Sequence, residues 1–266
     1  MTGPPPRVFL NSVPKAGTHL LMELVRNLPR MMFSGRHHAL RDFSIEPGSP
    51  PEHVPAIDLD AFGRVLEKVR NGQFMTAHFP YRQDVELMLE QRGFSSLLIL
   101  RDPRDVAVSH ALYVSGTERH WLHRRYTEIL LTPEERLMAS ITGFPDDEIS
   151  NGLESIGQRF DQYLGWHTSP NVLVCRFEAL VGSPGGGSRE EAMRAVRAVA
   201  EHLERPLSKE ESERMARRNW SQSTATFRRG QIGDWRNHFN EDHREAFKQV
   251  AGEVLIRLGY ERDLSW

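Results

Sequence analysis

The sequence predicts an α/β fold in which a central parallel sheet is flanked by helices on both faces, in a single domain. Residues 7–28, RVFLNSVPKAGTHLLMELVRNL, pass from an apolar run through a short loop into an amphipathic segment, which indicates a strand, a loop and a helix. Residues 97–110 repeat this order, with a turn at Asp102-Pro103. The apolar run Leu97–Leu100 is typical of a parallel strand that is buried on both faces.

The loop of the first of these segments has the composition of an anion-binding site. Gly17 allows backbone N–H groups to approach an anion, and the start of the next helix adds partial positive charge. Lys15 supplies a full charge, and Thr18 and His19 supply side-chain donors. The loop is P-loop-like in position, but a nucleoside-triphosphate loop carries its lysine after the second glycine, whereas Lys15 precedes the glycine. An ordinary turn capped by the threonine is the alternative.

Residues 29–58 are rich in Pro, Gly, Ser, Arg and His and predict a long surface segment. A segment of this length inside a compact domain is usually functional or mobile. His37 and His38 have no cysteine or acidic partner at metal-ligand spacing, which favours a solvated or substrate-lining pair over a metal site.

The following elements are predicted from apolar spacing and from breaks at Pro and Gly. His78 falls at the end of a short strand, where open α/β sheets place their ligands. A glycine-rich turn at 181–188 reads as a flexible surface loop, because no lysine or arginine stands at phosphate-loop spacing. The predicted elements are a helix over 59–71, a strand over Phe74–Ala77, a helix over 84–92, a strand over 171–180, a helix over 189–204 and a last helix containing Phe247, Val250, Val254 and Leu258.

Four segments resemble the motifs of one enzyme family. PKAGTHLL (14–21) closely resembles the 5′-phosphosulfate loop of sulfotransferases that use 3′-phosphoadenosine 5′-phosphosulfate, and AHFP (77–80) resembles the family's T-H-[LF]-P segment. LRDPRDVAVS (100–109) resembles the motif that binds the cofactor's 3′-phosphate, and FRRGQIGDWRNHF (227–239) resembles the carboxyl-terminal segment R-K-G-x-x-G-D-W-K-x-x-[FL]. The segments occur in the family's order, and with no signal peptide or membrane span expected the chain resembles a soluble sulfotransferase of the cytosolic or bacterial type.

The resemblance implies a role for each matching residue. His78 would act as the general base, and Lys15 would neutralise charge on the leaving phosphate. Leu20 replaces a tryptophan that packs on adenine in many family members, so Phe177 and Phe227 become the expected adenine contacts. The implied cofactor-binding residues are Lys15, Ala16, Gly17, Thr18, His19, Leu20, Arg101, Ser109, Phe177, Phe227, Arg228, Arg229 and Gly230.

The resemblance leaves the acceptor side open. Residues 29–58 and 115–160 lie outside the motifs and are expected to form the acceptor-side loops or lid of a sulfotransferase domain that spans 1–266. Helices are expected within 115–160, with Trp121, Tyr126 and Phe144 as either acceptor contacts or core residues. The implied acceptor is a hydroxyl on a small molecule or on a carrier-bound chain, and no metal is expected to be required.

Composition limits the other classes of function. A formal net charge of −2 argues against a broadly basic nucleic-acid binder. Residues 1–6, MTGPPP, do not resemble a signal peptide, and the sequence contains no run of eighteen apolar residues. The only cysteine, Cys175, lies in an apolar run and cannot form an internal disulfide. These features predict a cytoplasmic protein with no membrane or nucleic-acid partner and leave the oligomeric state open.

Two alternatives remain at this stage. A small-molecule kinase that uses a nucleoside triphosphate would show a magnesium requirement and turnover of ATP. A catalytically inactive nucleotide-binding protein would bind adenosine 3′,5′-bisphosphate without transferring a group to any acceptor.

Overall fold

The computed structural model describes residues 4–45, 56–218 and 230–266. Contacts divide these residues into two compact units. The first unit contains the described parts of Met1–Gly48, Pro55–Arg101 and Tyr163–Ile232, and the second contains Asp102–Gln162 and Gly233–Trp266. Within the described ranges, every helix is too short or too polar to cross a lipid bilayer.

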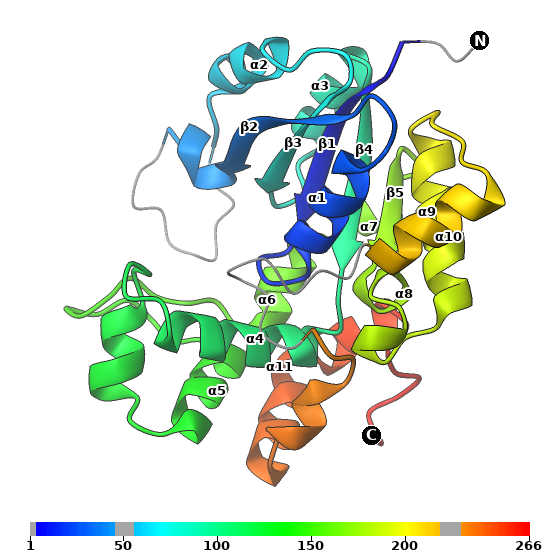
Figure 1. Ribbon diagram of the computed structural model, residues 1–266. Coiled ribbons are helices and arrows are strands. Elements are labelled where there is room, and N and C mark those ends of the chain that lie inside the picture. The colour runs from blue at the N-terminus through cyan, green and yellow to red at the C-terminus, as the bar shows by residue number, and fades with distance from the viewer. Residues whose placement is uncertain (1–3, 46–55, 219–229) are drawn as a thin grey trace. The chain divides into compact units, whose positions relative to one another are not determined.

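The first unit is built on one five-stranded sheet in the order β2-β3-β1-β4-β5 (Figure 1). Each neighbouring pair of strands is parallel. The chain passes from one side of β1 to the other between β3 and β4, which leaves β1 at the centre. The strands are β1 (Arg7–Ser12), β2 (Met32–Ala39), β3 (Gln73–His78), β4 (Phe94–Leu100) and β5 (Val172–Arg176).

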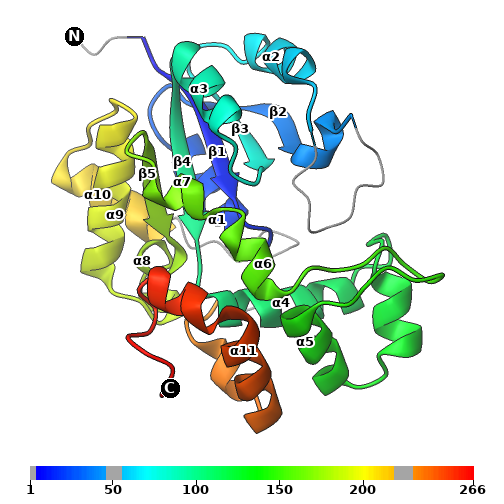
Figure 2. The same cartoon turned by 180° about the vertical axis from the view of Figure 1, so that it is seen from behind.

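Alternating side chains of β1 explain why helices cover both faces of this sheet (Figures 1 and 2). Val8 and Leu10 pack into a core shared with α1 (Thr18–Arg26), α8 (Phe177–Leu180), α9 (Arg189–His202) and α10 (Lys209–Arg218). Phe9 faces the other way, and its ring centroid lies 6.4 Å from that of Phe62 in α2 (Leu59–Glu67) and 5.9 Å from that of Trp166 in α7 (Leu164–Thr168). The helix α3 (Gln83–Gln91) packs against β4. The predicted fold class, a parallel sheet between two helical layers, is confirmed.

One strand contradicts the sequence prediction. We expect a surface segment over 29–58, whereas Met32–Ala39 forms the edge strand β2 and Leu40–Phe43 forms a short 3-10 helix, η1. An edge strand pairs on one side only and needs no apolar run, so its polar sequence gives no strand signal. The pairing of β2 with β3 also shifts register between Phe33 and His37, where Gly35 takes a φ of 76°.

The second unit consists mainly of helices. Asp102 begins α4, because its side-chain oxygen accepts a hydrogen bond of 2.9 Å from the Arg104 amide and Pro103 fills the first helical position. Helices are present within 115–160, as expected, whereas a lid there stays a prediction. The elements are α4 (Pro103–Ser115), the π-helix η2 (Arg125–Ile129), α5 (Pro133–Thr142), α6 (Ile156–Asp161), η4 (Asp234–Asn237) and α11 (Glu241–Arg257).

Candidate active site

Predicted site residues of the first unit follow the carboxyl ends of its parallel strands. The loop with Lys15 follows β1, His78 ends β3, Arg101 follows β4 and Phe177 follows β5. Because the carboxyl ends of parallel strands lie along the same edge of a sheet, the topology brings these four residues to one edge. This edge is formed by strand ends and is distinct from the edge strand β2. This edge is also where the chain changes direction across β1, which is the usual position of ligands in open α/β sheets.

The loop after β1 is a tight turn with two residues in the left-handed region. Lys15 has a φ of 72° and Gly17 a φ of 113°. The Ala16 amide donates to the Val13 carbonyl over 3.0 Å, and Ala16 is buried while the residues on either side of it are half-buried. Beyond the turn, His19 is exposed and Leu20 packs against the core. The turn therefore places its half-buried lysine directly before the amino end of α1.

Gly17 fits this turn for two separate reasons. A β-carbon at this position would lie 2.8 Å from Cδ2 of Phe177 and 3.1 Å from Cδ1 of Ile99. The φ of 113° is also one that L side chains rarely adopt.

We expect Gly17→Ala to lower the free energy of unfolding by about 2 kcal/mol or more, since backbone strain and a contact with a buried ring add together. Gly93→Ala is the matched control, because Gly93 has a positive φ of 67° but nothing within 4 Å of its added β-carbon. The control should lose only about 1 kcal/mol. Urea denaturation of the three proteins measures both values, and equal losses in the two variants would contradict the close approach of Phe177.

His78 is held in one tautomer by the end of β1. Its Nδ1 lies 2.8 Å from the Ser12 carbonyl oxygen, and because a carbonyl can only accept, Nδ1 carries the proton and donates it. Nε2 is then the unprotonated nitrogen that can take a proton. The Ser12 hydroxyl lies 3.2 Å from the same Nδ1 and 2.6 Å from the Thr18 hydroxyl, so it connects the histidine to the first turn of α1.

Burial sets the charge state of this histidine. Loss of solvation lowers the pKa of His78 to about 4, the hydrogen bond to Ser12 opposes that change, and the charges of His37, Lys15 and His19 reinforce it. The backbone of the next residue is fixed as well, since the Asn11 side chain donates to the Phe79 carbonyl over 2.8 Å and accepts from the Phe79 amide over 2.9 Å. The result is a neutral imidazole held rigidly beside a cationic loop.

Arg101 lies between the end of β4 and the segment that carries Gly230. Its guanidinium lies 4.3 Å from the centroid of the Phe177 ring, and Nη2 donates to the Gln231 carbonyl over 3.1 Å. The arginine is 8% exposed and the phenylalanine 4%. Phe177 therefore supports the guanidinium and has little free surface of its own.

The glycine-rich turn predicted as a flexible loop has a packing role. Ser183–Gly185 forms the 3-10 helix η3, whose Gly185 carbonyl accepts from the Ile232 amide over 3.0 Å. The Gln231 side chain donates to the Pro184 carbonyl over 3.0 Å. Gly230, with a φ of 55°, stands directly before this anchored pair.

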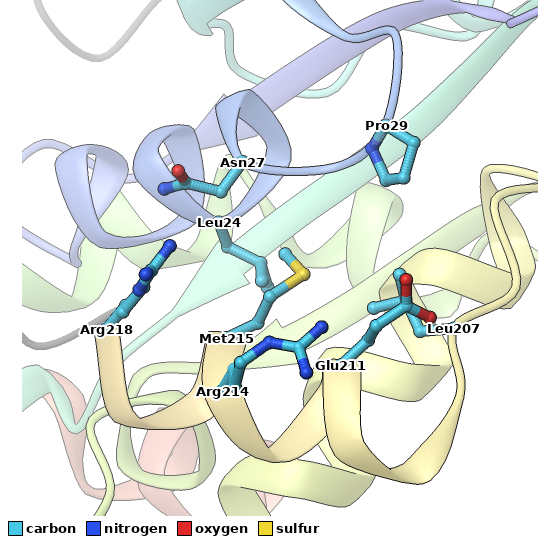
Figure 3. Close-up of a pocket in the computed structure, with 8 residues that line it drawn as sticks. All are labelled: Leu24, Asn27, Pro29, Leu207, Glu211, Arg214, Met215 and Arg218. Carbon is cyan, nitrogen blue, oxygen red and sulfur yellow. The ribbon is translucent and has the colours of Figure 1, made fainter.

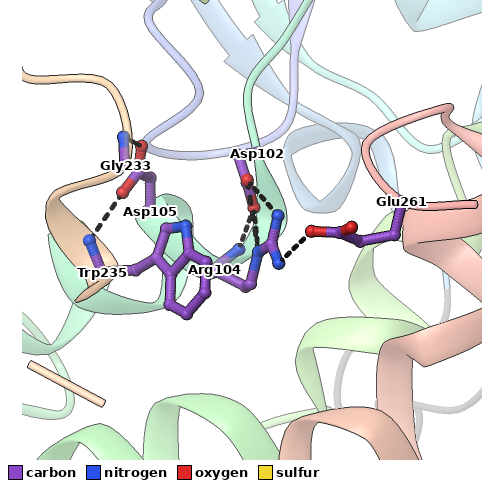
Figure 4. Close-up of polar contacts among 6 residues, drawn as sticks. All are labelled: Asp102, Arg104, Asp105, Gly233, Trp235 and Glu261. Atoms are coloured by element: carbon purple, nitrogen blue, oxygen red, sulfur yellow. Dashed lines mark hydrogen bonds and ion pairs between the residues drawn. The ribbon is translucent and has the colours of Figure 1, made fainter. Parts of the chain in front are cut away.

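In the second unit, two motifs that are distant in sequence are joined (Figure 4). The Asp105 carboxylate accepts from the Gly233 amide and from the Trp235 amide, each over 2.9 Å. Arg104 is ion-paired with Asp102 over 2.8 Å, and its guanidinium lies 4.2 Å from the centroid of the Trp235 ring. The charged residues that follow Arg101 in its motif thus hold the Gly-Asp-Trp turn in place.

Some predicted residues stand apart from this geometry. Ser109 lies in α4 of the second unit, so its pairing with Arg101 stays a prediction. Phe227, Arg228 and Arg229 lie outside the described residues. Of the candidates within 115–160, Tyr126 is fully buried, whereas Trp121 is 47% exposed.

Sequence reasoning missed three residues that hold the motif segments in place: Asn11, Ser12 and Asp105. Asn11 and Ser12 end the apolar strand just before the recognised loop, and two polar residues in that position were a sequence signal that could have been used. Asp105 lies inside a recognised motif, but its partners are 128 and 130 residues away. His37 was named as a solvated or substrate-lining residue, but its contact with His78 could not be predicted, because the strand β2 was not.

A pocket of about 170 Å³ lies elsewhere in the first unit, between α1 and α10 (Figure 3). Leu24 and Asn27 lie at the carboxyl end of α1, whereas the loop of Lys15 precedes its first turn. This pocket is therefore separate from the site at the sheet edge. Its lining residues are Leu24, Asn27, Pro29, Leu207, Glu211, Arg214, Met215 and Arg218.

Among the described residues, no cluster of three His, Cys, Asp or Glu side chains is arranged to hold a metal ion.

Comparison with known proteins finds a matching family model and similar proteins. A family model described as "Sulfotransferase domain" matches residues 5–259 and so spans both units. The chain is 25% identical over 281 residues to sulfotransferase 2B1 of Rattus norvegicus, covering 94% of the chain and 71% of the rat protein. It is 24% identical over 191 residues to sulfotransferase 6B1 of Danio rerio, covering 62% of the chain and 55% of that protein.

Solved structures share the fold. Mouse sulfotransferase SULT7A1, in a complex with PAP, superposes with a TM-score of 0.62 at 18% identity over 96% of this chain and 89% of its own. Retinol dehydratase, in a complex with androsterone and inactive cofactor PAP, gives a TM-score of 0.56 at 18% identity over 94% of this chain and 80% of its own.

Proposed function

Because the chain belongs to the sulfotransferase domain family, we propose that it transfers a sulfuryl group from 3′-phosphoadenosine 5′-phosphosulfate to an acceptor hydroxyl, leaving adenosine 3′,5′-bisphosphate. One observation carries the proposal: a neutral His78, with Nδ1 bonded to the Ser12 carbonyl, stands beside the loop of Lys15 and Thr18. That arrangement pairs a base with an anion site at one sheet edge.

The residues at this edge fit the charges of such a cofactor. The loop amides and the amino end of α1 offer hydrogen-bond donors and partial positive charge to an anion, and Lys15 adds a full charge. Arg101 offers a guanidinium that stays charged and can hold a phosphate with two hydrogen bonds. We assign the 5′-phosphate to Lys15, Thr18 and the loop amides.

We assign the 3′-phosphate to Arg101, Ser109, Arg228, Arg229 and Gly230. Phe177 and Phe227 remain the proposed adenine contacts, and Phe177 also supports the arginine through its ring.

When bound, the cofactor supplies the sulfuryl group and a phosphate as the leaving group. His78 removes the proton of the acceptor hydroxyl through Nε2 while Nδ1 stays bonded to Ser12. Lys15 neutralises the negative charge that grows on the leaving oxygen. Cationic side chains provide this stabilisation, so no metal ion is required in the proposed reaction. The loop and the arginines hold the reactants in line, as in phosphoryl transfer.

The acceptor is proposed only as a class. A small molecule or a carrier-bound chain with a free hydroxyl suits a histidine base, and the related retinol dehydratase binds androsterone. We propose that residues within 29–58 and 115–160 line the acceptor side, and β2 from the first of these segments supports this through the position of His37 next to His78.

The proposed function is tested by transfer from ³⁵S-labelled cofactor to a panel of phenols, primary alcohols and sterols, with the release of adenosine 3′,5′-bisphosphate measured in parallel. A labelled, acceptor-dependent product is expected. Turnover of ATP with magnesium would favour a kinase instead. Tight binding of adenosine 3′,5′-bisphosphate with no transfer to the panel or to an extract of the host would favour an inactive nucleotide-binding protein.

The lowered pKa of His78 predicts an unusual pH profile. A base with a pKa of about 4 stays unprotonated, and therefore active, as the pH falls from 8 through 6.5. We expect kcat/KM for the cofactor to be flat over that range and to fall only as the pH approaches about 4, since this parameter reports the free enzyme. Steady-state rates between pH 3.5 and 8, with circular dichroism at each pH as the control for unfolding, measure the profile. A midpoint near 6.5 in folded protein would contradict the burial of the base.

A further inference from the structure

A second imidazole, that of His37, lies against His78. The two ring centroids are 4.7 Å apart, and the ring planes are inclined at 80°, so the edge of one ring faces the other. His37 comes from β2 and is in register with Thr76 of β3, two residues before His78. The Nδ1 atom of His37 lies 2.9 Å from the Thr76 hydroxyl, and Thr76 is 2% exposed. The second ring is therefore anchored to the buried sheet.

The backbone of β2 directs His37 to this position. The register shift between Phe33 and His37 is a local irregularity of the kind that turns a side chain toward a site. The next residue, His38, belongs to a different environment, because its ring lies 5.2 Å from that of Phe43 and its Nδ1 is 3.4 Å from the Asp42 carboxylate. Only the first histidine of the pair contacts His78.

Charged groups from neighbouring elements act on the pKa of each ring. The charges of His37 from β2, of Lys15 from the loop and of His19 from α1 each lower the pKa of His78. Burial is the main cause that lowers the pKa of His37. The charges of His38 and His19 lower this pKa further, and the Asp42 carboxylate raises it. Two positive imidazoles at 4.7 Å repel each other strongly in a site with little water, so a proton on one ring opposes a proton on the other.

We propose that His37 is a positioning residue for His78. Through the edge contact, His37 fixes the plane of the His78 ring, and His37 must be neutral for His78 to accept the acceptor's proton. The proposal rests on the proposed function for its catalytic meaning. Its physical content, the coupling of two rings, exists in the protein without cofactor or acceptor.

Three variants separate ring packing from charge. His37→Phe keeps a ring against His78 and removes the titrating nitrogens. His37→Asn keeps a polar atom close to where Nδ1 bonds Thr76 and removes most of the ring. His38→Asn is the matched control on the same strand. The first readout is the NMR titration of the His78 Cε1–H signal in each folded protein between pH 3.5 and 8.

We expect the pKa of His78 to be higher in His37→Phe than in the wild type, because the opposing charge is gone, and to be unchanged in His38→Asn. We expect His37→Asn to lose about ten-fold in kcat, because the edge contact that fixes the ring plane of His78 is lost while the bond to Ser12 remains, with KM for the cofactor unchanged. An unshifted His78 titration in His37→Phe overturns the coupling, and a wild-type kcat in His37→Asn overturns the positioning role. The titration does not depend on turnover, so failure of the proposed function would leave it readable.

Discussion

Replacing His78 with alanine is expected to lower kcat by about 10²-fold or more, because the acceptor hydroxyl loses the group that removes its proton. The Kd for adenosine 3′,5′-bisphosphate should stay close to the wild-type value, since His78 bonds the end of β1 through Ser12 and is not among the groups assigned to the phosphates. Steady-state kinetics and calorimetric titration of the nucleotide measure the two quantities on the same preparation.

His78→Asn is the matched control for this variant. The asparagine amide can donate to the Ser12 carbonyl much as Nδ1 does, so it preserves the local hydrogen bond but provides no base. We expect the same loss of kcat as in the alanine variant, with stability nearer to that of the wild type. Turnover at the wild-type rate in either variant would exclude proton transfer by this histidine.

Replacing Arg101 with alanine is expected to weaken binding of adenosine 3′,5′-bisphosphate by about 10²-fold, or roughly 2.7 kcal/mol, because charge-assisted hydrogen bonds to the 3′-phosphate are lost. Binding of adenosine 5′-monophosphate, which has no 3′-phosphate, should change much less. Calorimetric titration of both nucleotides against wild type and variant isolates the part of the loss that belongs to the 3′ group.

Two further variants control for charge and geometry. Arg101→Lys keeps the positive charge but loses the planar fork that lies over Phe177, so we expect an intermediate affinity. Arg70→Ala removes one positive charge from an exposed residue that precedes β3, at the opposite end of the strands, and should change neither affinity. Equal weakening for both nucleotides in Arg101→Ala would show that the arginine does not recognise the 3′-phosphate.

The sequence predicted the interior of the sheet better than its edge. β1 and β4 are strands of apolar residues buried on both faces, so their patterns identify them directly. β2 pairs on one side, contains a glycine and a register shift, and reads as a polar loop. The missed helix α10 (Lys209–Arg218) has mostly charged residues and buries only Ser212 and Ala216, so its pattern was equally weak.

The candidate site shows the same division. Lys15, His78 and Arg101 could be predicted, because each follows a recognisable strand and stands in a local motif. The contacts that hold them could not, since they join residues far apart in the chain: Ser12 with His78, and Arg101 with the carbonyl of Gln231. Local sequence reports the chemistry of a side chain, whereas the partner that fixes its orientation depends on strand order.

Arg104 packs against the rings of Trp235 and Trp266, whose fluorescence can report on the second unit. Its guanidinium lies 4.2 Å from the centroid of Trp235 and 4.5 Å from that of Trp266, so both indoles emit from beside a fixed charge. In the first unit, Trp166 of α7 is 1% exposed and packs against Phe9 of β1. Each unit thus contains its own intrinsic optical probe, and single-tryptophan versions of the chain could follow whether the two parts melt together or one after the other.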